Sequence, residues 1–162
     1  MSLKDSIGPE LPYLRRYARA ITGSQALGDA AVRETLEALL IAPSEFDDSR
    51  PPRLELYRIF HRLWKPSTVG ALAPSAPTAQ LDARCRQSLL LTTVEGFNAN
   101  EAGEILGVPA GDVAADLVQA REIIANQLVA DVMVIEDEAI IALHIKSIVR
   151  EIGHNVVGIA RT

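Results

Sequence analysis

The chain has 162 residues, 48% of them hydrophobic, and its formal net charge is −5. This length allows one domain or two small ones with a buried core, and the negative charge disfavours nonspecific binding to DNA or to an acidic membrane. No run approaches about 18 uncharged apolar residues, and the N-terminus lacks the apolar core of a signal peptide. We therefore expect a cytoplasmic protein without a membrane segment.

Residues 1–65 predict a helical lobe with a core of its own. Apolar side chains recur at helical spacing in residues 9–22, 26–41 and 51–64, the pattern of helices that bury one face. Gly23 and Pro43 end the first two helices, and paired prolines suit the first turn of the third.

Residues 66–79 interrupt this pattern. The segment holds three prolines, no charge and no helical periodicity, which is typical of a linker. We therefore divide the helical part of the chain into a lobe at 1–65, a linker at 66–79 and a second lobe at 80–130.

The second lobe contains a helix-turn-helix pattern between residues 98 and 121. Gly107 can end the first helix in a positive-φ conformation, and Pro109 can open the second. In DNA-binding versions of this motif the second helix enters the major groove, but residues 98–128 hold five acids against one base, which repels phosphate. We expect a protein partner to bind in the cleft between the two lobes, and the acids expected to contact it are Glu101, Glu104, Asp112 and Asp116. For the last two, stabilisation of the helix macrodipole is the alternative.

The pattern changes type at residue 131. A continuous apolar run at 132–135 is typical of a parallel strand buried on both faces, and a helix to about residue 152 and a second apolar stretch follow. This β-α-β order places Glu136 and Asp137 at the carboxyl end of the first strand, where open α/β sheets bind ligands. Carboxylates there suit Mg²⁺, and helix capping is the alternative.

The helix-turn-helix resembles region 4 of extracytoplasmic-function sigma factors over residues 81–128. The matching framework positions are Glu101, Ala102, Ile105, Leu106, Gly107, Val108, Pro109, Gly111, Val113, Leu117, Ala120 and Arg121. The departures fall where that family contacts DNA. They are Asp112, Ala114, Asp116 and Gln119, at positions where the family has threonine, lysine, arginine and arginine. The resemblance implies a sigma fold that has lost its DNA-binding surface.

Residues 1–65 resemble region 2 of the same sigma factors more weakly, in the stretches GSQALGDAAVRETLEALL and LELYRIFHRLW. The asparagine, aspartate and paired arginines with which that family opens promoter DNA are absent, and the helix ends in HRLWK before a proline. A basic stripe remains, formed by Arg50, Arg53, Arg58, Arg62 and Lys65. This stripe either contacts DNA or forms an ordinary solvated face, and we favour the solvated face.

Residues 131–162 resemble the opening of response-regulator receiver domains, in the stretch VMVIEDEAIIALHIKSIVREIGHNVVGIA. By that resemblance Glu136 and Asp137 belong to the acidic pair that binds Mg²⁺ in an intact receiver. The acceptor aspartate and the later sensing residues of that family have no counterpart in this chain, so we expect neither phosphorylation nor bound Mg²⁺ in it. The predicted fold class is mainly α, with two helical sigma-like lobes followed by an incomplete α/β receiver at 131–162.

A sigma-like module followed by a receiver is the arrangement of the PhyR-type regulators of the bacterial general stress response. In that family a sensor histidine kinase acts upstream. Receiver phosphorylation then frees the sigma-like domain to capture an anti-sigma factor of the NepR type, which releases the true sigma factor. The resemblance implies an anti-anti-sigma response regulator that binds no DNA directly.

Two other function classes were weighed against this one. A DNA-binding extracytoplasmic-function sigma factor is the alternative, and its promoter binding would fall steeply with salt. An enzyme is not expected, because the chain shows no Ser/His/Asp spacing, phosphate loop or zinc motif.

Overall fold

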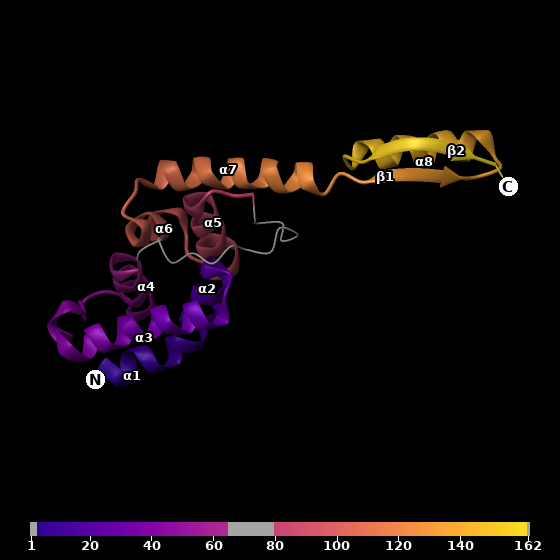
Figure 1. Ribbon diagram of the computed structural model, residues 1–162. Helices are drawn as coiled ribbons and strands as arrows, with labels where there is room; N and C mark the ends of the chain where they lie inside the picture. Colours follow the sequence, from indigo (N-terminus) through magenta and orange to yellow (C-terminus); the bar gives the residue numbers. More distant parts are fainter. Residues whose placement is uncertain (1–2, 65–79, 162) are drawn as a thin grey trace. The chain divides into compact units, whose positions relative to one another are not determined.

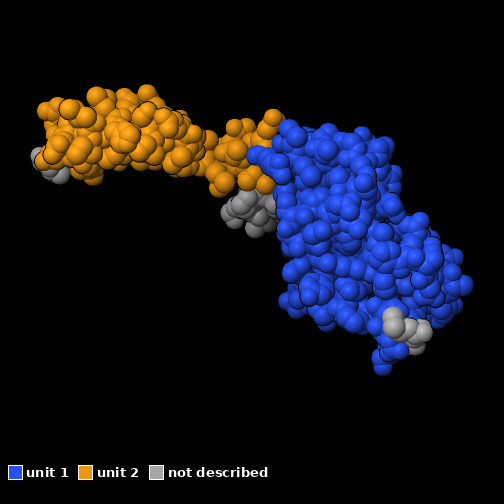
Figure 2. All heavy atoms as spheres, turned by 180° about the vertical axis from the view of Figure 1, so that it is seen from behind, with its two compact units in different colours: residues 1–121 blue, residues 122–162 orange. Residues whose placement is uncertain are grey.

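The computed structural model describes residues 3–64 and 80–161 (Figure 1). The chain divides into two compact units, Met1–Arg121 and Glu122–Thr162 (Figure 2). The linker expected at 66–79 lies outside the described residues, as does Lys65. The first unit is helical and the second contains a β-α-β motif, so the predicted fold class is confirmed. Among the described helices, none has both the length and the apolar character needed to cross a membrane.

The N-terminal half of the first unit consists of helices joined by short connections. They are α1 (Leu3–Ile7), α2 (Leu11–Thr22), α3 (Gln25–Ile41) and α4 (Pro52–Leu63), with single 3₁₀ turns at Gly8–Glu10 and Pro43–Glu45. Gly23 ends α2 with a φ of 67°, and Ser24 caps α3 by accepting a hydrogen bond from the N–H of Leu27. The turn between α2 and α3 is therefore encoded by adjacent residues.

Close packing of α2 against α3 depends on Gly28. A Cβ atom at this position would lie 2.6–2.9 Å from backbone atoms of Ala18 and Arg19. The absence of a side chain lets the two helix backbones approach each other, so this glycine is required by packing and not by a turn.

The helix-turn-helix forms as predicted. It comprises α6 (Ala99–Leu106) and α7 (Ala110–Gln127), and Gly107 between them has a φ of 69°. The helix that precedes α6 changes type along its length. It is α-helical in α5 (Ala83–Leu89) and continues as a π-helix at Leu90–Val94, where the N–H of Glu95 bonds to the carbonyl of Leu90 at 3.0 Å.

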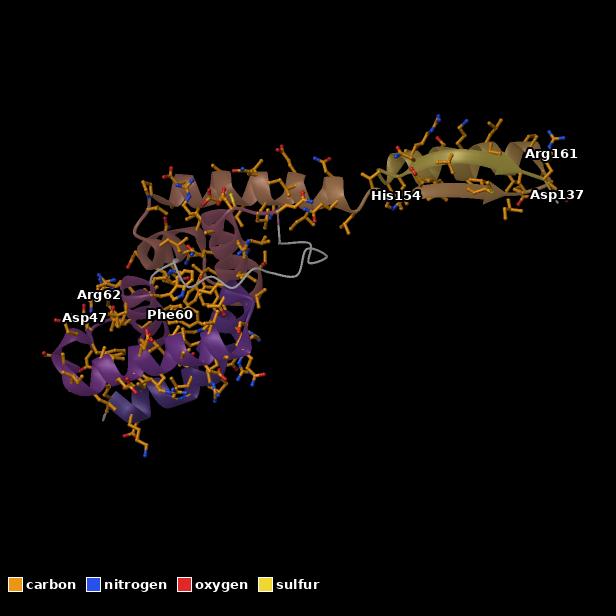
Figure 3. All side chains as sticks on the ribbon, in the orientation of Figure 1. Asp47, Phe60, Arg62, Asp137, His154 and Arg161 are labelled. Carbon is orange, nitrogen blue, oxygen red and sulfur yellow. The ribbon has the colours of Figure 1, made fainter. Side chains whose placement is uncertain are left out.

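One hydrophobic core runs through the first unit. It joins Tyr17 and Phe60 to Phe97, Ile105 and Val113, which come from the part of the chain after residue 80. Figure 3 labels Phe60 at the centre of this region. The sequence predicted a separate core for residues 1–65, whereas the described residues on both sides of the linker share one. Pooling their apolar surfaces buries more area than two small cores would.

The second unit contains two parallel strands and one helix. β1 (Asp131–Ile135) pairs with β2 (Asn155–Ala160), in a register that places Asp131 opposite Asn155 and Ile135 opposite Ala160, and α8 (Ala139–Glu151) connects them. The prediction that β1 is buried on both faces is wrong, because its described residues are buried at Val134 alone. Within the described part of this unit α8 is the one helix that packs on the sheet, which leaves apolar side chains such as Met133 and Val157 exposed.

Candidate partner-binding site

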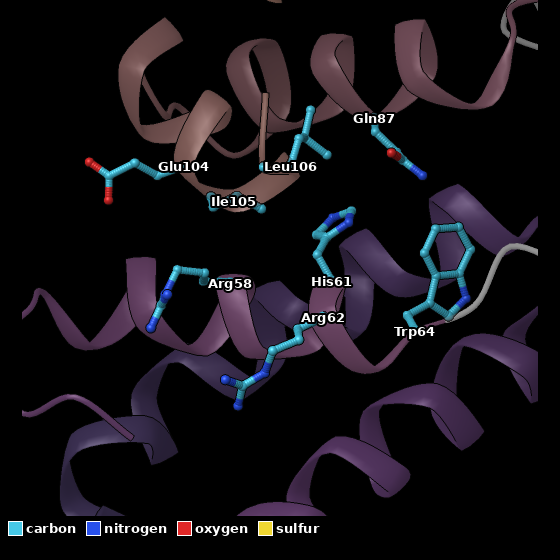
Figure 4. Close-up of a pocket in the computed structure, with 9 residues that line it drawn as sticks. Arg58, His61, Arg62, Trp64, Gln87, Glu104, Ile105 and Leu106 are labelled. Carbon is cyan, nitrogen blue, oxygen red and sulfur yellow. The ribbon is translucent and has the colours of Figure 1, made fainter. Parts of the chain in front are cut away.

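A depression of about 370 Å³, here named the seam pocket, lies in the first unit between α4 and α6 (Figure 4). Its lining residues are Arg58, His61, Arg62, Trp64, Gln87, Glu104, Ile105, Leu106 and Gly107. The walls therefore come from both sigma-like parts of the chain and combine an apolar strip with charges of both signs. Such a surface can hold an apolar side chain of a partner and fix its neighbours by polar contacts.

The face that α4 turns toward the pocket follows from its periodicity. Arg58, His61 and Arg62 are separated by three and one positions and lie on one side of the helix, while Leu56 and Ile59 are buried in the core. The helix stops at Trp64, whose backbone N–H donates a hydrogen bond to the carbonyl of Phe60 at 2.8 Å.

The opposite wall is set by the two ends of α6. The side chain of Asn98 accepts a hydrogen bond from the N–H of Glu101 at 3.0 Å, and the Glu101 carboxylate accepts one from the N–H of Asn98 at 2.8 Å. This reciprocal capping box fixes the first turn. At the other end, Gly103 lies against the backbone after the helix, since a Cβ there would be 2.7 Å from the carbonyl oxygen of Val108.

His61 gives the pocket a neutral aromatic floor. Its Nε2 lies 2.7 Å from the hydroxyl of Tyr17, and the rings of Tyr17, Phe60 and Trp64 surround it. Burial of the imidazole lowers the pKa of His61 to about 3, because the charged form is poorly solvated there. At neutral pH this histidine contributes no positive charge to the site.

The arginines of the basic stripe are paired with carboxylates of the same chain. For each described arginine of the stripe the shortest pair is Arg50–Glu104 at 2.6 Å, Arg53–Glu95 at 2.9 Å, Arg58–Glu55 at 2.8 Å and Arg62–Glu45 at 2.9 Å. The expectation of a simple solvated face is therefore incomplete. Because each guanidinium faces an acid, the stripe has less positive potential to offer a phosphate backbone.

The structure separates the four predicted partner acids. Glu101 is engaged in the capping box, and Glu104 lines the seam pocket while pairing with Arg50. Asp112 is exposed in the first turn of α7. Glu104 and Asp112 are accessible to a partner, whereas the Glu101 carboxylate caps the first turn of α6.

Asp116 corrects the sequence interpretation, because it is not a surface acid. The residue is 2% exposed, and its carboxylate accepts hydrogen bonds from Arg84 and from the hydroxyl of Ser88, each at 2.9 Å. Asp116 shares the inward face of α7 with Val113 and Ala120. That spacing of three and four residues was visible in the sequence, but the compensating arginine on α5 was not.

The predicted Mg²⁺ ligands follow β1, as expected from the β-α-β order. Figure 3 places Asp137 and Arg161 at one end of the strand pair and His154 at the other. The pKa of Asp137 is lowered, first by its hydrogen bond with the Glu136 side chain and then by backbone N–H groups. The described residues contain no cluster of three or more groups that could hold a metal, and the assignment of Glu136 and Asp137 to a Mg²⁺ site stays a prediction.

The sequence predicted a partner-binding cleft between the two lobes, but not the residues that line the seam pocket. His61 and Trp64 belong to the helix predicted at 51–64, and Ile105 and Leu106 are framework positions of the predicted helix-turn-helix. No local signal brings α4 and α6 together, since their contact depends on the shared core. The proline-rich linker favoured the opposite view of two independent lobes.

Comparisons with known proteins match both parts of the first unit. A family model described as the sigma2 domain of PhyR matches residues 7–61, and one described as the sigma-like domain of the response regulator PhyR matches residues 79–127. The phyllosphere-induced regulator PhyR of Methylorubrum extorquens is 38% identical over 170 aligned positions, covering 100% of this chain and 64% of that protein.

Solved structures agree with these matches. Anti-anti-sigma factor PhyR complexed with anti-sigma factor NepR from Bartonella quintana is 45% identical with a TM-score of 0.79, covering 99% of this chain and 65% of that one. The PhyRSL–NepR complex from Sphingomonas sp. Fr1 is 37% identical with a TM-score of 0.67, covering 78% and 88%. The chain thus spans just under two thirds of the length of the Methylorubrum extorquens and Bartonella quintana proteins. On sequence and fold together, it belongs to the PhyR family.

Proposed function

We propose that this chain acts as an anti-anti-sigma factor, a sigma-factor mimic that sequesters an anti-sigma factor of the NepR type. Capture of that inhibitor would leave the true sigma factor free to join RNA polymerase in a general stress response. This work is done in the cytoplasm and needs no catalytic step.

The observation that carries the proposal is the internal pairing of the arginines of the basic stripe with carboxylates. Arg50, Arg53, Arg58 and Arg62 are the described arginines of this stripe that could contact a phosphate backbone, and each faces an acid of the chain. The second helix of the helix-turn-helix carries exposed Asp112 where the sigma factors have threonine, and exposed Ala114 where they have lysine. A surface with sigma shape and cancelled charge suits a protein that binds sigma factors better than it suits a promoter.

The comparisons support the identity of the partner. Structures of two relatives contain NepR bound to PhyR chains, at 45% and 37% identity to this one. The seam pocket supplies a place for an apolar anchor residue of the partner, flanked by Glu104 for a basic neighbour. A partner with basic amphipathic helices would meet these features.

We propose that phosphorylation of the receiver controls anti-sigma binding in the intact protein. A sensor histidine kinase would phosphorylate an acceptor aspartate in the rest of the receiver, and Mg²⁺ held in part by Glu136 and Asp137 would assist that transfer. Within this chain, these two carboxylates are the residues that would contribute to the metal site.

Isothermal titration of the chain with a NepR-type anti-sigma factor tests the proposal. We expect binding without phosphorylation and, in a parallel titration with promoter DNA at low and moderate salt, no specific binding. Salt-sensitive promoter binding without anti-sigma binding would instead identify a working sigma factor, and the charge argument above would then be wrong.

A further inference from the structure

Glu95, directly after the π-helix Leu90–Val94, is a buried acid whose carboxylate accepts four side-chain hydrogen bonds. Its side chain is 0% exposed. Oε1 accepts hydrogen bonds from Nε and Nη2 of Arg16 at 3.2 and 3.0 Å, and Oε2 accepts from Nη2 of Arg53 and the hydroxyl of Tyr57, both at 2.9 Å. A carboxylate is tolerated at such depth because its charge and its lone pairs are satisfied.

All three donors come from the opposite side of the linker. Arg16 lies on α2, and Arg53 and Tyr57 lie on α4, between 38 and 79 positions away from Glu95. The network therefore joins the region 2-like part of the chain to the region 4-like part. The other described ion pair that bridges these two parts, Arg50–Glu104, is solvent-exposed on both sides, so it contributes less.

The backbone around Glu95 directs its side chain toward α2 and α4. The π-helical turn bonds the N–H of Glu95 to Leu90, and Gly96 has a φ of 75°. These two features turn the chain so that Phe97 also packs against the region 2-like part, with its ring centroid 5.0 Å from that of Tyr57. Single π-helical turns inside helices often mark functional positions.

The position of Glu95 in the chain gives the network a consequence for binding. α6 begins at Ala99, four residues later, and α6 forms one wall of the seam pocket while α4 forms the other. The contacts of Glu95 thus fix where α6 starts relative to α4. We infer that Glu95 is a positioning residue, which holds α6 against α4 and keeps the seam pocket in the shape that the anti-sigma factor recognises.

Replacement of the carboxylate by an amide tests this inference, which rests on the proposed function for its binding readout. Glu95→Gln keeps the size of the side chain but leaves Arg16 without its counter-charge and Arg53 with Glu10 alone, at 3.5 Å. Asp29→Asn is the matched control, because Asp29 likewise bonds two arginines, Arg15 and Arg19, at 3.3 and 2.7 Å. These contacts join α2 to α3 and do not reach the region 4-like part.

Two measurements separate positioning from general stability. Hydrogen exchange followed by mass spectrometry should show faster exchange across residues 99–106 in Glu95→Gln and not in Asp29→Asn. Calorimetric titration with the anti-sigma factor should show about tenfold weaker binding for Glu95→Gln, as expected if the competent arrangement falls to about a tenth of the population. Binding of Asp29→Asn should stay within about twofold of wild type.

The outcomes are distinguishable. If Glu95→Gln matches the control in exchange and in affinity, Glu95 is a stability residue and the inference is wrong. If the wild-type chain does not bind the anti-sigma factor, the proposed function fails, while exchange in residues 99–106 still decides whether Glu95 holds α6. If Glu95→Gln does not fold, Arg16→Gln replaces it. The Arg16 side chain is 52% exposed and donates two of the four hydrogen bonds to Glu95. Arg16→Gln should change exchange and affinity in the same direction as Glu95→Gln, by a smaller amount.

Discussion

Nη1 of Arg50 lies 2.6 Å from Oε2 of Glu104, so the loop before α4 is joined to α6 across the rim of the seam pocket. The two side chains are 36% and 51% exposed. Water and salt therefore screen the pair, and its value for stability is small even though its position at the proposed binding surface is central.

Reversal of charge at Glu104 should affect binding more than folding. We expect Glu104→Lys to weaken anti-sigma binding, because it removes the acid at the pocket and adds a base beside Arg50 and Arg58. The loss of the exposed pair itself should lower the free energy of unfolding by no more than about 1 kcal/mol. Calorimetric titration and urea unfolding measure the two effects. The double variant Arg50→Glu with Glu104→Lys restores this pair but places an acid beside Asp47 and Glu55. A return of binding in the double variant would therefore contradict direct contact of Glu104 with the partner.

Asp116 should behave as a core residue. Asp116→Asn removes the charge that faces Arg84 and leaves Ser88 with a poorer acceptor, so we expect the free energy of unfolding to fall by about 1–3 kcal/mol, with the lower end set by the exposure of Arg84. Asp112→Asn, on the exposed side of the same helix, should change it by less than about 0.5 kcal/mol. Equal effects of the two variants in urea unfolding would contradict the burial of Asp116.

Gly28 should not tolerate a methyl group. Gly28→Ala places a Cβ within 2.6–2.9 Å of backbone atoms in α2, and rigid backbone cannot move aside as a flexible side chain can. We expect a loss of about 1–3 kcal/mol in the free energy of unfolding. Gly111→Ala is the control, since nothing lies within 4 Å of a Cβ there. That substitution, in the first turn of α7, should be neutral or stabilising by up to about 1 kcal/mol, and thermal unfolding of the two variants side by side makes the comparison.

His61 predicts how stability depends on pH. Burial lowers its pKa in the folded state from 6.5 to about 3, so between these values the unfolded chain binds a proton that the folded chain does not. The contribution of neutral His61 to stability is therefore complete above about pH 6.5 and is lost as the pH falls toward 3, with a slope of at most about 1.4 kcal/mol per pH unit.

The comparison of wild type with His61→Gln isolates this effect from the titration of carboxylates. Denaturant unfolding at pH values between about 7 and 4 should give a steeper loss of stability for wild type than for the variant. Parallel curves for the two proteins would mean that the imidazole accepts its proton without cost in the folded state.

Sequence reasoning succeeded where a few neighbouring residues decide the structure. Gly107 and Pro109 marked the turn of the helix-turn-helix, and the apolar run before Glu136 and Asp137 marked β1. Capping, turn geometry and side-chain periodicity act over one or two turns of chain, so their signals can be read directly from adjacent residues. The resemblance to PhyR-type regulators depended on such local motifs and on their order.

Tertiary structure decided what depends on residues far apart in the chain. An acid in a helix reads as a surface residue until Arg84 and Ser88 are known to surround Asp116, and Glu95 gave no signal because its donors lie up to 79 positions away. The burial of a charge is governed by the partners that packing brings to it, and these partners are not encoded nearby. The sequence by itself therefore determined the elements, the loss of DNA-binding charge and the family. Only the fold decided which acids are exposed and where α4 and α6 form the seam pocket.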